Sequence, residues 1–194
     1  MSKDAVRQAA FNKRLAIPLG ERKALAQTFM QYFLAHAALP EKGAVISAYM
    51  PFNAELDVRP LMSHLRGEGY SIVVPHVVHN LSGLEFRTWA EDTPVYTNLH
   101  GIEEVALDHS EVLLPDYMLV PLIAFDDKGG RMGYGSGQFD RTFENMQKAQ
   151  HTFFTVGVAY DSQREDSVPV DEHDYPLDMV ITEKNVYHCR ENRK

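Results

Sequence analysis

Hydrophobic and polar positions follow two different periods along the chain. In the first 38 residues the spacing is helical, with a basic segment at 2–16 and a second segment at about 21–38, separated by Pro18 and Gly20. Beyond residue 43 the spacing changes to short apolar runs between turn residues. These runs predict strands at 44–50, 71–75, 84–89, 117–121, 153–160 and 179–182.

Helical spacing returns between strands at 57–69 and 139–150, so the recurring unit is strand, helix, strand. Several predicted strands are continuously apolar, which is typical of a mostly parallel sheet with helices on both faces. The sequence therefore predicts a single domain over residues 1–194, a three-layer α/β/α sandwich. Its parts would be basic N-terminal helices (2–38), an α/β core (44–183) and a short polar tail (184–194).

Composition narrows the class of protein. Hydrophobic residues make up 44% of the chain and charged residues 24%, which is ordinary for a soluble globular domain. The net charge of -8 argues against nucleic acid or an anionic membrane as a partner. Cys189 is the only cysteine, which excludes an internal disulfide and a cysteine-based zinc site. With no signal-like or membrane-spanning apolar run, we expect a cytoplasmic protein.

A glycine-rich segment follows the strand predicted at 117–121. Five glycines fall within nine positions at 129–137, with Arg131 inside the segment and Arg141 just after it. Backbone N–H groups of such a loop can turn toward an anion, and the helix that follows adds its positive end. We interpret the segment as a phosphate-binding loop, and a plain glycine-rich turn is the alternative.

The loop does not match three well-known glycine motifs. A P-loop requires lysine and then serine or threonine after its last glycine, where this chain has Gln138 and Phe139. Read from Gly133 and Gly135, the dinucleotide fingerprint requires a third glycine at position 138. A nucleophile elbow around Ser136 would need glycines at positions 134 and 138.

The N-terminal segment carries three cations on one side of its predicted helix. Lys3, Arg7 and Arg14 are separated by four and seven residues, which places them within a sector of roughly 40°. A triphosphate would suit this basic stripe, since lysine and arginine are its usual partners. A solvated basic face is the alternative.

Motifs distributed over nearly the whole chain carry a family likeness. The densest is LVPLIAFDDKGGRMGYGSGQFDR at 119–141; others are the N-terminal K-x-x-x-R, Y-x-P-x-x-x-E-L-D at 49–57, F-x-x-W, G-I-E-E, and V-P-x-x-x-H-D-x-x-L-D near the end. In this content and order the chain resembles the 5-formyltetrahydrofolate cyclo-ligase family, also called methenyltetrahydrofolate synthetases.

The resemblance implies a fold similar to the sugar-isomerase and CoA-transferase type. It also implies an ATP- and Mg²⁺-dependent ligase that closes the ring of 5-formyltetrahydrofolate, giving 5,10-methenyltetrahydrofolate, ADP and phosphate. Phosphorylation of the formyl oxygen would make it a leaving group, so catalysis would depend on positioning and charge neutralisation. The expected partners are these small molecules, and the expected state is a monomer or weak homo-oligomer.

The resemblance also assigns residues to this site. The ATP-binding residues would be Lys3, Arg7, Arg14, Arg131, Gly133, Tyr134, Gly135, Ser136, Gly137, Gln138, Phe139, Asp140 and Arg141. The folate-binding residues would be Met50, Glu55, Trp89, Gly135, Ser136, Gly137, Gln138 and Phe139. The catalytic residues would be Arg141, Gln138 and Tyr134, and the Mg²⁺ ligands Asp140 and Asp178.

Two departures from the family pattern leave rival functions open. The two family tyrosines before Asp140 are Gln138 and Phe139 here, and the proline after the second acid of G-I-E-E is Val105. A non-catalytic folate or nucleotide-binding module is therefore the main alternative, and a metal-free sugar-phosphate isomerase is a third. Three further features are predicted to be incidental: the pair His76 and His79, which face opposite ways on a strand, the solvated acids at 103–104, and Cys189.

Overall fold

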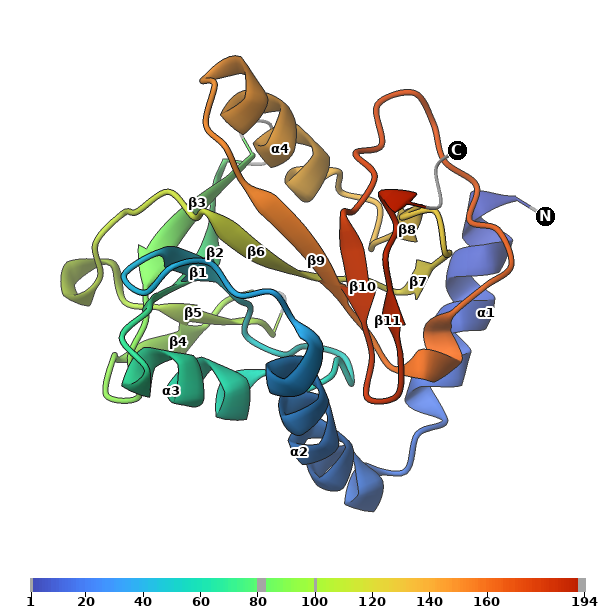
Figure 1. Cartoon of the computed structure of the whole chain (residues 1–194), viewed down its shortest axis with the longest axis horizontal. Helices are drawn as coiled ribbons and strands as arrows, with labels where there is room; N and C mark the ends of the chain where they lie inside the picture. The colour runs from blue at the N-terminus through green and yellow to red at the C-terminus, as the bar shows by residue number, and fades with distance from the viewer. Residues whose placement is uncertain (1, 80–82, 100, 192–194) are drawn as a thin grey trace.

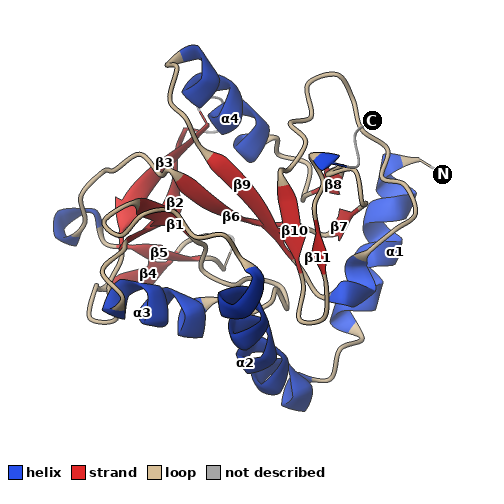
Figure 2. Ribbon diagram, in the orientation of Figure 1, coloured by secondary structure: helices blue, strands red, loops and turns tan. Residues whose placement is uncertain are grey.

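The computed structural model describes residues 2–79, 83–99 and 101–191, and within them a seven-stranded sheet forms the centre of the molecule. Its order is β11-β10-β9-β6-β1-β2-β3, and the inner strands run parallel while β3 and β11 pair antiparallel at the two edges (Figures 1 and 2). The bounds are β1 Val45–Ser47, β2 Ser71–His79, β3 Gly83–Thr88, β6 Tyr117–Pro121, β9 Phe154–Val158, β10 Met179–Ile181 and β11 Val186–Tyr187. The six predicted strands and the mostly parallel sheet are confirmed.

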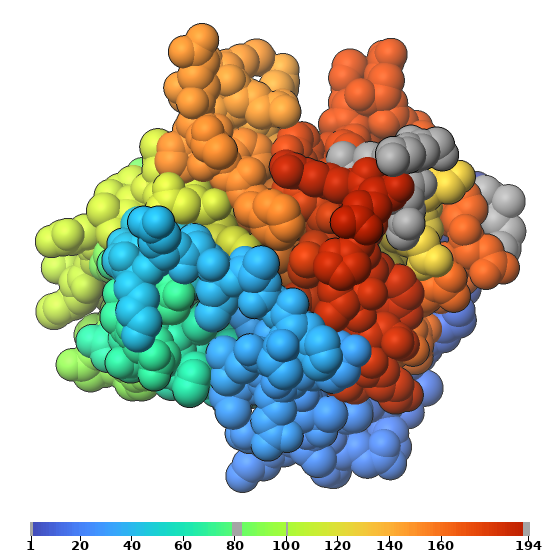
Figure 3. All heavy atoms as spheres, viewed as in Figure 1, coloured from blue at the N-terminus to red at the C-terminus, as the bar shows by residue number. Residues whose placement is uncertain are grey.

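Helices cover both faces of this sheet, as the continuously apolar strands predicted. On one face, Phe33 of α2 (Leu19–His36) and Leu61 of α3 (Arg59–Gly67) pack in a core that includes Leu119. On the other face, Phe143 of α4 (Gln138–Lys148) packs in a second core with Val120. Successive β6 side chains thus enter opposite cores, so β6 has no polar face. In the space-filling view, α2 and the segment after it cover much of the lower front of the molecule (Figure 3).

The N-terminal helix α1 (Lys3–Leu15) packs at one end of the molecule and not on either face of the sheet. Its Val6 and Ala10 form a third core with residues from around the hairpin of β7 (Ala124–Phe125) and β8 (Arg131–Met132). The Ser2 side chain caps α1 by accepting a hydrogen bond from the Ala5 N–H at 3.3 Å. The predicted break at Gly20 is wrong, because α2 begins at Leu19, directly after Pro18.

Three further features differ from the sequence-based prediction. A second hairpin, β4 (Val95–Thr97) with β5 (Glu103–Val105), packs against β2, so the acids at 103–104 lie on a strand and Glu104 is buried. The C-terminal segment is not simply a polar tail, since it supplies edge strand β11 and buries Cys189 completely. The remaining elements are the short 3₁₀ helices η1 (Leu107–His109) and η2 (Asp161–Gln163). The helices in the described part of the chain are too short or too polar to cross a membrane.

Candidate active site

A cavity of about 970 Å³ lies beyond the carboxyl ends of parallel strands β1, β2 and β6. Tyr49 and Met50 follow β1, Pro75 and His76 lie in the second half of β2, and Pro121 ends β6, and all of them line the cavity. The strand order reverses here, because the chain runs from β1 to β2 on one side and from β6 to β9 on the other. A reversal of this kind is where open α/β sheets bind ligands.

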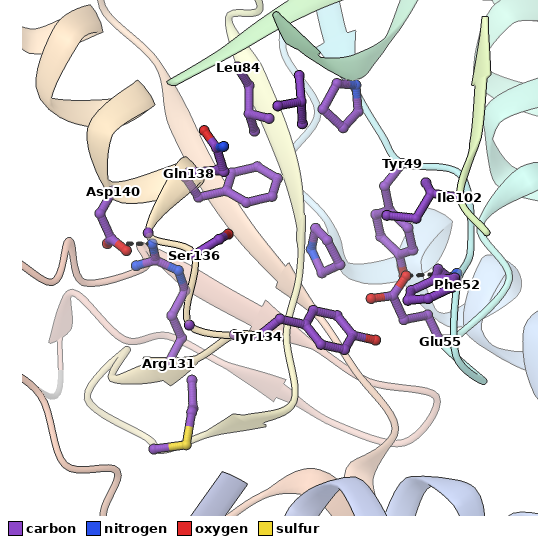
Figure 4. Close-up of a pocket in the computed structure, with 18 of the residues that line it drawn as sticks. Tyr49, Phe52, Glu55, Leu84, Ile102, Arg131, Tyr134, Ser136, Gln138 and Asp140 are labelled. Atoms are coloured by element: carbon purple, nitrogen blue, oxygen red, sulfur yellow. Dashed lines mark hydrogen bonds and ion pairs between the residues drawn. The ribbon is translucent and has the colours of Figure 1, made fainter. Parts of the chain in front are cut away.

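The glycine-rich loop forms one wall of this cavity. Residues 133–140 all line it (Figure 4). Gly135 and Gly137 have φ angles of +98° and +66°, a left-handed conformation that favours glycine. Gly137 lies directly before α4, so the positive end of that helix faces the cavity at Gln138.

Cations from α1 and from the loop gather at this wall. Arg7 donates from Nε to the carbonyl oxygen of Gly133 at 3.0 Å, which docks α1 on the loop. Arg131 donates to Oδ1 of Asp140 at 2.5 Å and lies with its guanidinium 5.1 Å from the centre of the Phe143 ring. Lys3 also lines the cavity. Arg7 also pairs with Asp4. Three cations with carboxylate partners, a helix N-terminus and glycine backbone therefore meet at one place, and these are groups from which phosphate sites are built.

Two aspartates from the segment before β10 complete this end of the cavity. Lys3 Nζ contacts Oδ2 of Asp171 at 2.8 Å and Oδ2 of Asp174 at 2.7 Å. Burial lowers the pKa of Lys3, but both hydrogen bonds outweigh it and leave the pKa above its ordinary value. Burial raises the pKa of Asp174, yet Lys3, the Asp171 N–H and the charge of Arg131 together hold it below its ordinary value. Asp174 is therefore a charged carboxylate, and the N–H next to it, on Tyr175, donates to Asp140 at 3.0 Å.

Away from the loop, the cavity holds the buried carboxylate of Glu55 beside the side chains of Tyr49, Met50 and Phe52. The turn that carries Glu55 contains Asn53 and Ala54 with φ of +46° and +63°, which non-glycine residues rarely adopt and which often marks functional sites. Oε2 of Glu55 accepts a hydrogen bond from the Phe52 N–H at 2.9 Å, and Tyr134 extends from the loop toward it (Figure 4). Burial raises the pKa of Glu55 to about 7, although the Phe52 N–H, Arg14 and Tyr134 all favour the charged form.

Four residues predicted for the site lie outside the cavity lining. Arg14 has a side chain with no solvent exposure, and Trp89 is buried in the core with α3. Arg141 donates to the carbonyl oxygen of Ser136 at 2.7 Å and so holds the loop from behind. Asp178 is buried, accepts from the N–H and hydroxyl of Thr155 at 2.9 and 3.0 Å, and pairs with Arg190. The other predicted site residues line the cavity.

A polar cluster on the β4–β5 hairpin was missed from the sequence. Glu104 accepts from the Tyr96 hydroxyl at 2.8 Å and from Nδ2 of Asn98 at 2.7 Å, and its Oε2 lies 2.7 Å from Nδ1 of His76. All four residues line the cavity. Asp174 was missed as well, although the motif H-D-x-x-L-D offered two aspartates, of which the prediction took the second.

Comparison with known proteins shows which family this chain matches. The model of the 5-formyltetrahydrofolate cyclo-ligase family matches residues 1–183. The 5-formyltetrahydrofolate cyclo-ligase of Escherichia coli K12 is 35% identical over 147 residues, covering 73% of this chain and 79% of that protein. The enzyme of the same name from Mycolicibacterium smegmatis is 26% identical over 189 residues, covering 94% of each. A solved 5,10-methenyltetrahydrofolate synthetase from Aquifex aeolicus superposes with a TM-score of 0.79 at 28% identity, covering 100% of this chain and 96% of that one.

Proposed function

The chain belongs to the 5-formyltetrahydrofolate cyclo-ligase family and is a ligase, and we propose that its cavity closes the ring of 5-formyltetrahydrofolate at the expense of ATP. The products would be 5,10-methenyltetrahydrofolate, ADP and phosphate. One observation carries the proposal: a single cavity joins a cationic glycine-rich loop to the buried carboxylate of Glu55. The match of the family model over residues 1–183 confirms the family predicted from the sequence motifs, and members of this family use ATP as a co-substrate.

The loop end of the cavity would bind the triphosphate. Lys3, Arg7 and Arg131 supply positive charge, and the loop backbone from Gly133 to Gly137 together with the start of α4 supplies N–H groups. Arg141 would act on this site by holding the loop through Ser136 and not by contacting phosphate. This arrangement has no need of a protein nucleophile, because the formyl oxygen of the substrate attacks the phosphorus.

In the reaction we propose, the formyl oxygen forms a bond to the γ-phosphorus and the bond to the β-phosphate oxygen breaks, which releases ADP. The neighbouring substrate nitrogen then attacks the activated carbon and loses its proton, and the formyl oxygen leaves as part of phosphate. The loop cations would neutralise charge on the transferred group, and alignment of the two substrates would supply the remaining rate acceleration. Gln138, at the cavity wall, is the side chain we assign to the transferring group. Tyr134 was predicted to act there too, but its hydroxyl bonds to Arg14 and Glu55, so we assign it to the folate end of the cavity.

The carboxylates at the loop end fit Mg²⁺. Within the described parts of the chain, no three His, Cys, Asp or Glu side chains gather into a metal cluster. Mg²⁺ needs no such cluster, since it usually takes one or two carboxylates beside phosphate oxygens and waters. We assign it to Asp140 and Asp174, which are joined through the Tyr175 N–H, in place of Asp178. When bound, Mg²⁺ would neutralise charge on the phosphates.

The end of the cavity at Glu55 would bind the pterin and benzoyl parts of the folate. Glu55 is the only carboxylate we assign to the pterin, whose amino and ring N–H groups are hydrogen-bond donors. Met50, Phe52 and Tyr49 supply the flat apolar surface that such a ring needs. Phe139 also lines the cavity and would contact the formyl group together with Gln138.

The direct test is the near-ultraviolet absorbance of the methenyl product, measured with purified protein, 5-formyltetrahydrofolate and Mg²⁺, with and without ATP. We expect a rise that requires ATP. Binding of ATP and folate without any rise would support a non-catalytic binding module instead, and turnover of a sugar phosphate would support an isomerase. We further propose that the enzyme works in the cytoplasm as a monomer or weak homo-oligomer, which size-exclusion chromatography would test.

A further inference from the structure

Arg14 is a buried cation that the proposed mechanism does not use. Its side chain has no solvent exposure, and it lies outside the cavity that Lys3 and Arg7 line. Nη1 donates to the carbonyl oxygen of Leu122 at 3.3 Å, and the guanidinium lies 5.2 Å from the centre of the Phe11 ring. A cation is costly to bury in such surroundings unless a negative group is close by.

That negative group is Glu55. Its Oε1 lies 3.9 Å from Nη1 of Arg14, and both side chains are almost fully buried. The Tyr134 hydroxyl joins them, because it accepts a hydrogen bond from Nη2 of Arg14 and also bonds to Glu55. The Arg14 guanidinium also lies 5.5 Å from the centre of the Tyr134 ring. Arg14 therefore reaches the folate end of the cavity in two ways, by its charge and through a hydroxyl.

We propose that Arg14 is a positioning residue for substrate binding, which holds the Glu55 carboxylate charged and oriented toward the folate, with Tyr134 as the hydrogen-bonding link. This inference rests on the proposed function, in which Glu55 contacts the pterin. It replaces a direct contact between Arg14 and ATP, which the complete burial of the side chain does not allow.

The surroundings of Glu55 show what Arg14 contributes. The titratable groups that face it are Arg14 from α1, Tyr134 from the loop and Tyr49 after β1, whose own pKa is raised by burial and then by the Glu55 charge. Arg14 is the cation among them. Burial raises the pKa of Glu55 to about 7, so the carboxylate is only partly charged at neutral pH even with Arg14 in place. Loss of the Arg14 charge would raise that pKa further and leave less carboxylate to accept from the pterin.

The test compares Arg14→Gln with the wild type in steady-state kinetics from pH 6 to pH 9. We expect KM for 5-formyltetrahydrofolate to rise, the midpoint of its pH dependence to move to higher pH, and KM for ATP to stay unchanged. Each unit of that movement raises the folate KM about tenfold below the midpoint. A raised KM for ATP with an unmoved midpoint would overturn the inference and restore the phosphate role. Arg66→Gln, which removes an exposed arginine paired with Glu91, is the matched control.

Two further variants keep the inference testable if Arg14→Gln does not fold. Tyr134→Phe removes only the linking hydroxyl, and we expect a smaller movement of the same midpoint in the same direction. Arg14→Lys keeps the charge, and we expect it to retain most of the wild-type midpoint. An unmoved midpoint in Tyr134→Phe would contradict the link. Glu55→Gln distinguishes failure of the proposed folate site from failure of the Arg14 inference. If this variant leaves the folate KM unchanged, the proposed folate site itself is wrong, whatever Arg14 does.

Discussion

At the scale of single residues, the site gains function at the expense of stability, and Glu55 shows this most clearly. Its side chain is only 6% exposed, and burial raises its pKa from 4.5 to about 7. A carboxyl group with a raised pKa binds its proton more tightly in the folded protein than in the unfolded chain. As the pH rises from 4.5 to 7, this group therefore lowers the free energy of unfolding.

Glu55→Gln is accordingly predicted to stabilise the protein above pH 7. The amide carries no charge to desolvate and can still accept a hydrogen bond from the Phe52 N–H. The pKa shift is the net of the cost of burial and the attraction of Arg14, so it already includes the loss of that attraction. It corresponds to about 3 kcal/mol, so the variant should exceed the wild type by up to this amount at pH 8 and converge with it near pH 4.5. Urea unfolding at the two pH values measures the difference. Glu68→Gln, at an exposed acid paired with Lys42, is the control, and equal stabilities at pH 8 would contradict the argument.

Asp174 is predicted to act in Mg²⁺ binding, and Asp178 in the stability of the fold. Asp174→Asn should raise the Mg²⁺ concentration for half-maximal activity by roughly tenfold or more, because it removes a charged carboxylate beside Asp140. Asp178→Asn should leave that concentration unchanged and lower the free energy of unfolding by about 1–3 kcal/mol, since it weakens bonds to Thr155 and Arg190. Mg²⁺ titrations and urea unfolding of both variants check this. The reverse pattern would restore Asp178 as a ligand.

Arg14 shows why residue roles were only partly predictable. Helical spacing correctly placed Lys3, Arg7 and Arg14 on one side of α1, but a helix also advances about 1.5 Å per residue. Arg14 therefore lies roughly 10 Å farther along the axis than Arg7, beyond the phosphate wall and against Glu55 and Tyr134. The angular position of a residue around a helix gives neither its distance along the axis nor its burial. The sequence could therefore indicate which side of α1 carries Arg14, but not which residues it contacts.

At the scale of elements, the strands predicted correctly from the sequence were the longer and more apolar ones. Strands with continuous apolar runs, such as β6 and β9, were found where predicted because both faces are buried. The β4–β5 hairpin was missed, since β4 is exposed along its length and β5 begins with two glutamates that resemble a solvated turn. Glu104 anchors that hairpin through a His76 contact between elements distant in sequence, which no local pattern encodes. The loop joined to α4 was predictable because glycine density and helical spacing are both local.

The backbone conformation of Gly137 predicts that Gly137→Ala disturbs the glycine-rich loop. Gly137 has a φ of +66°, and an added Cβ would lie 3.0 Å from Nη1 of Arg141. We predict a loss of about 1–2 kcal/mol in the free energy of unfolding and a raised KM for ATP, because the start of α4 would shift. Gly133→Ala is the matched control for stability, since its φ is not positive and an added Cβ meets no atom within 4 Å. Thermal unfolding and ATP titration compare them, and equal destabilisation by both would contradict a conformational role for Gly137.

At the scale of the whole molecule, the active site depends on segments from both ends of the chain. Lys3 of α1 contacts Asp171 and Asp174, which lie just before β10, and Arg7 contacts the glycine-rich loop after β8. The two larger cores lie on opposite faces of the same seven-stranded sheet. If one core unfolded, the sheet that supports the other core would be exposed to water. A single domain over residues 1–194 therefore remains our prediction, now for a structural reason that the sequence did not contain.

This predicts one cooperative unfolding transition. Trp89 is the only tryptophan and lies in the core beneath α2 and α3, so its fluorescence reports one face of the sheet. Far-ultraviolet circular dichroism reports all helices, including α4 on the other face and α1 at the end. In urea the two signals should change with the same midpoint and slope, because one sheet connects the regions that they report. A non-hydrolysable ATP analogue with Mg²⁺ should raise both midpoints equally, since it would bind α1, the loop and the segment before β10 together. An early loss of helical signal with unchanged fluorescence would instead mean that α1 or α4 unfolds as a separate unit.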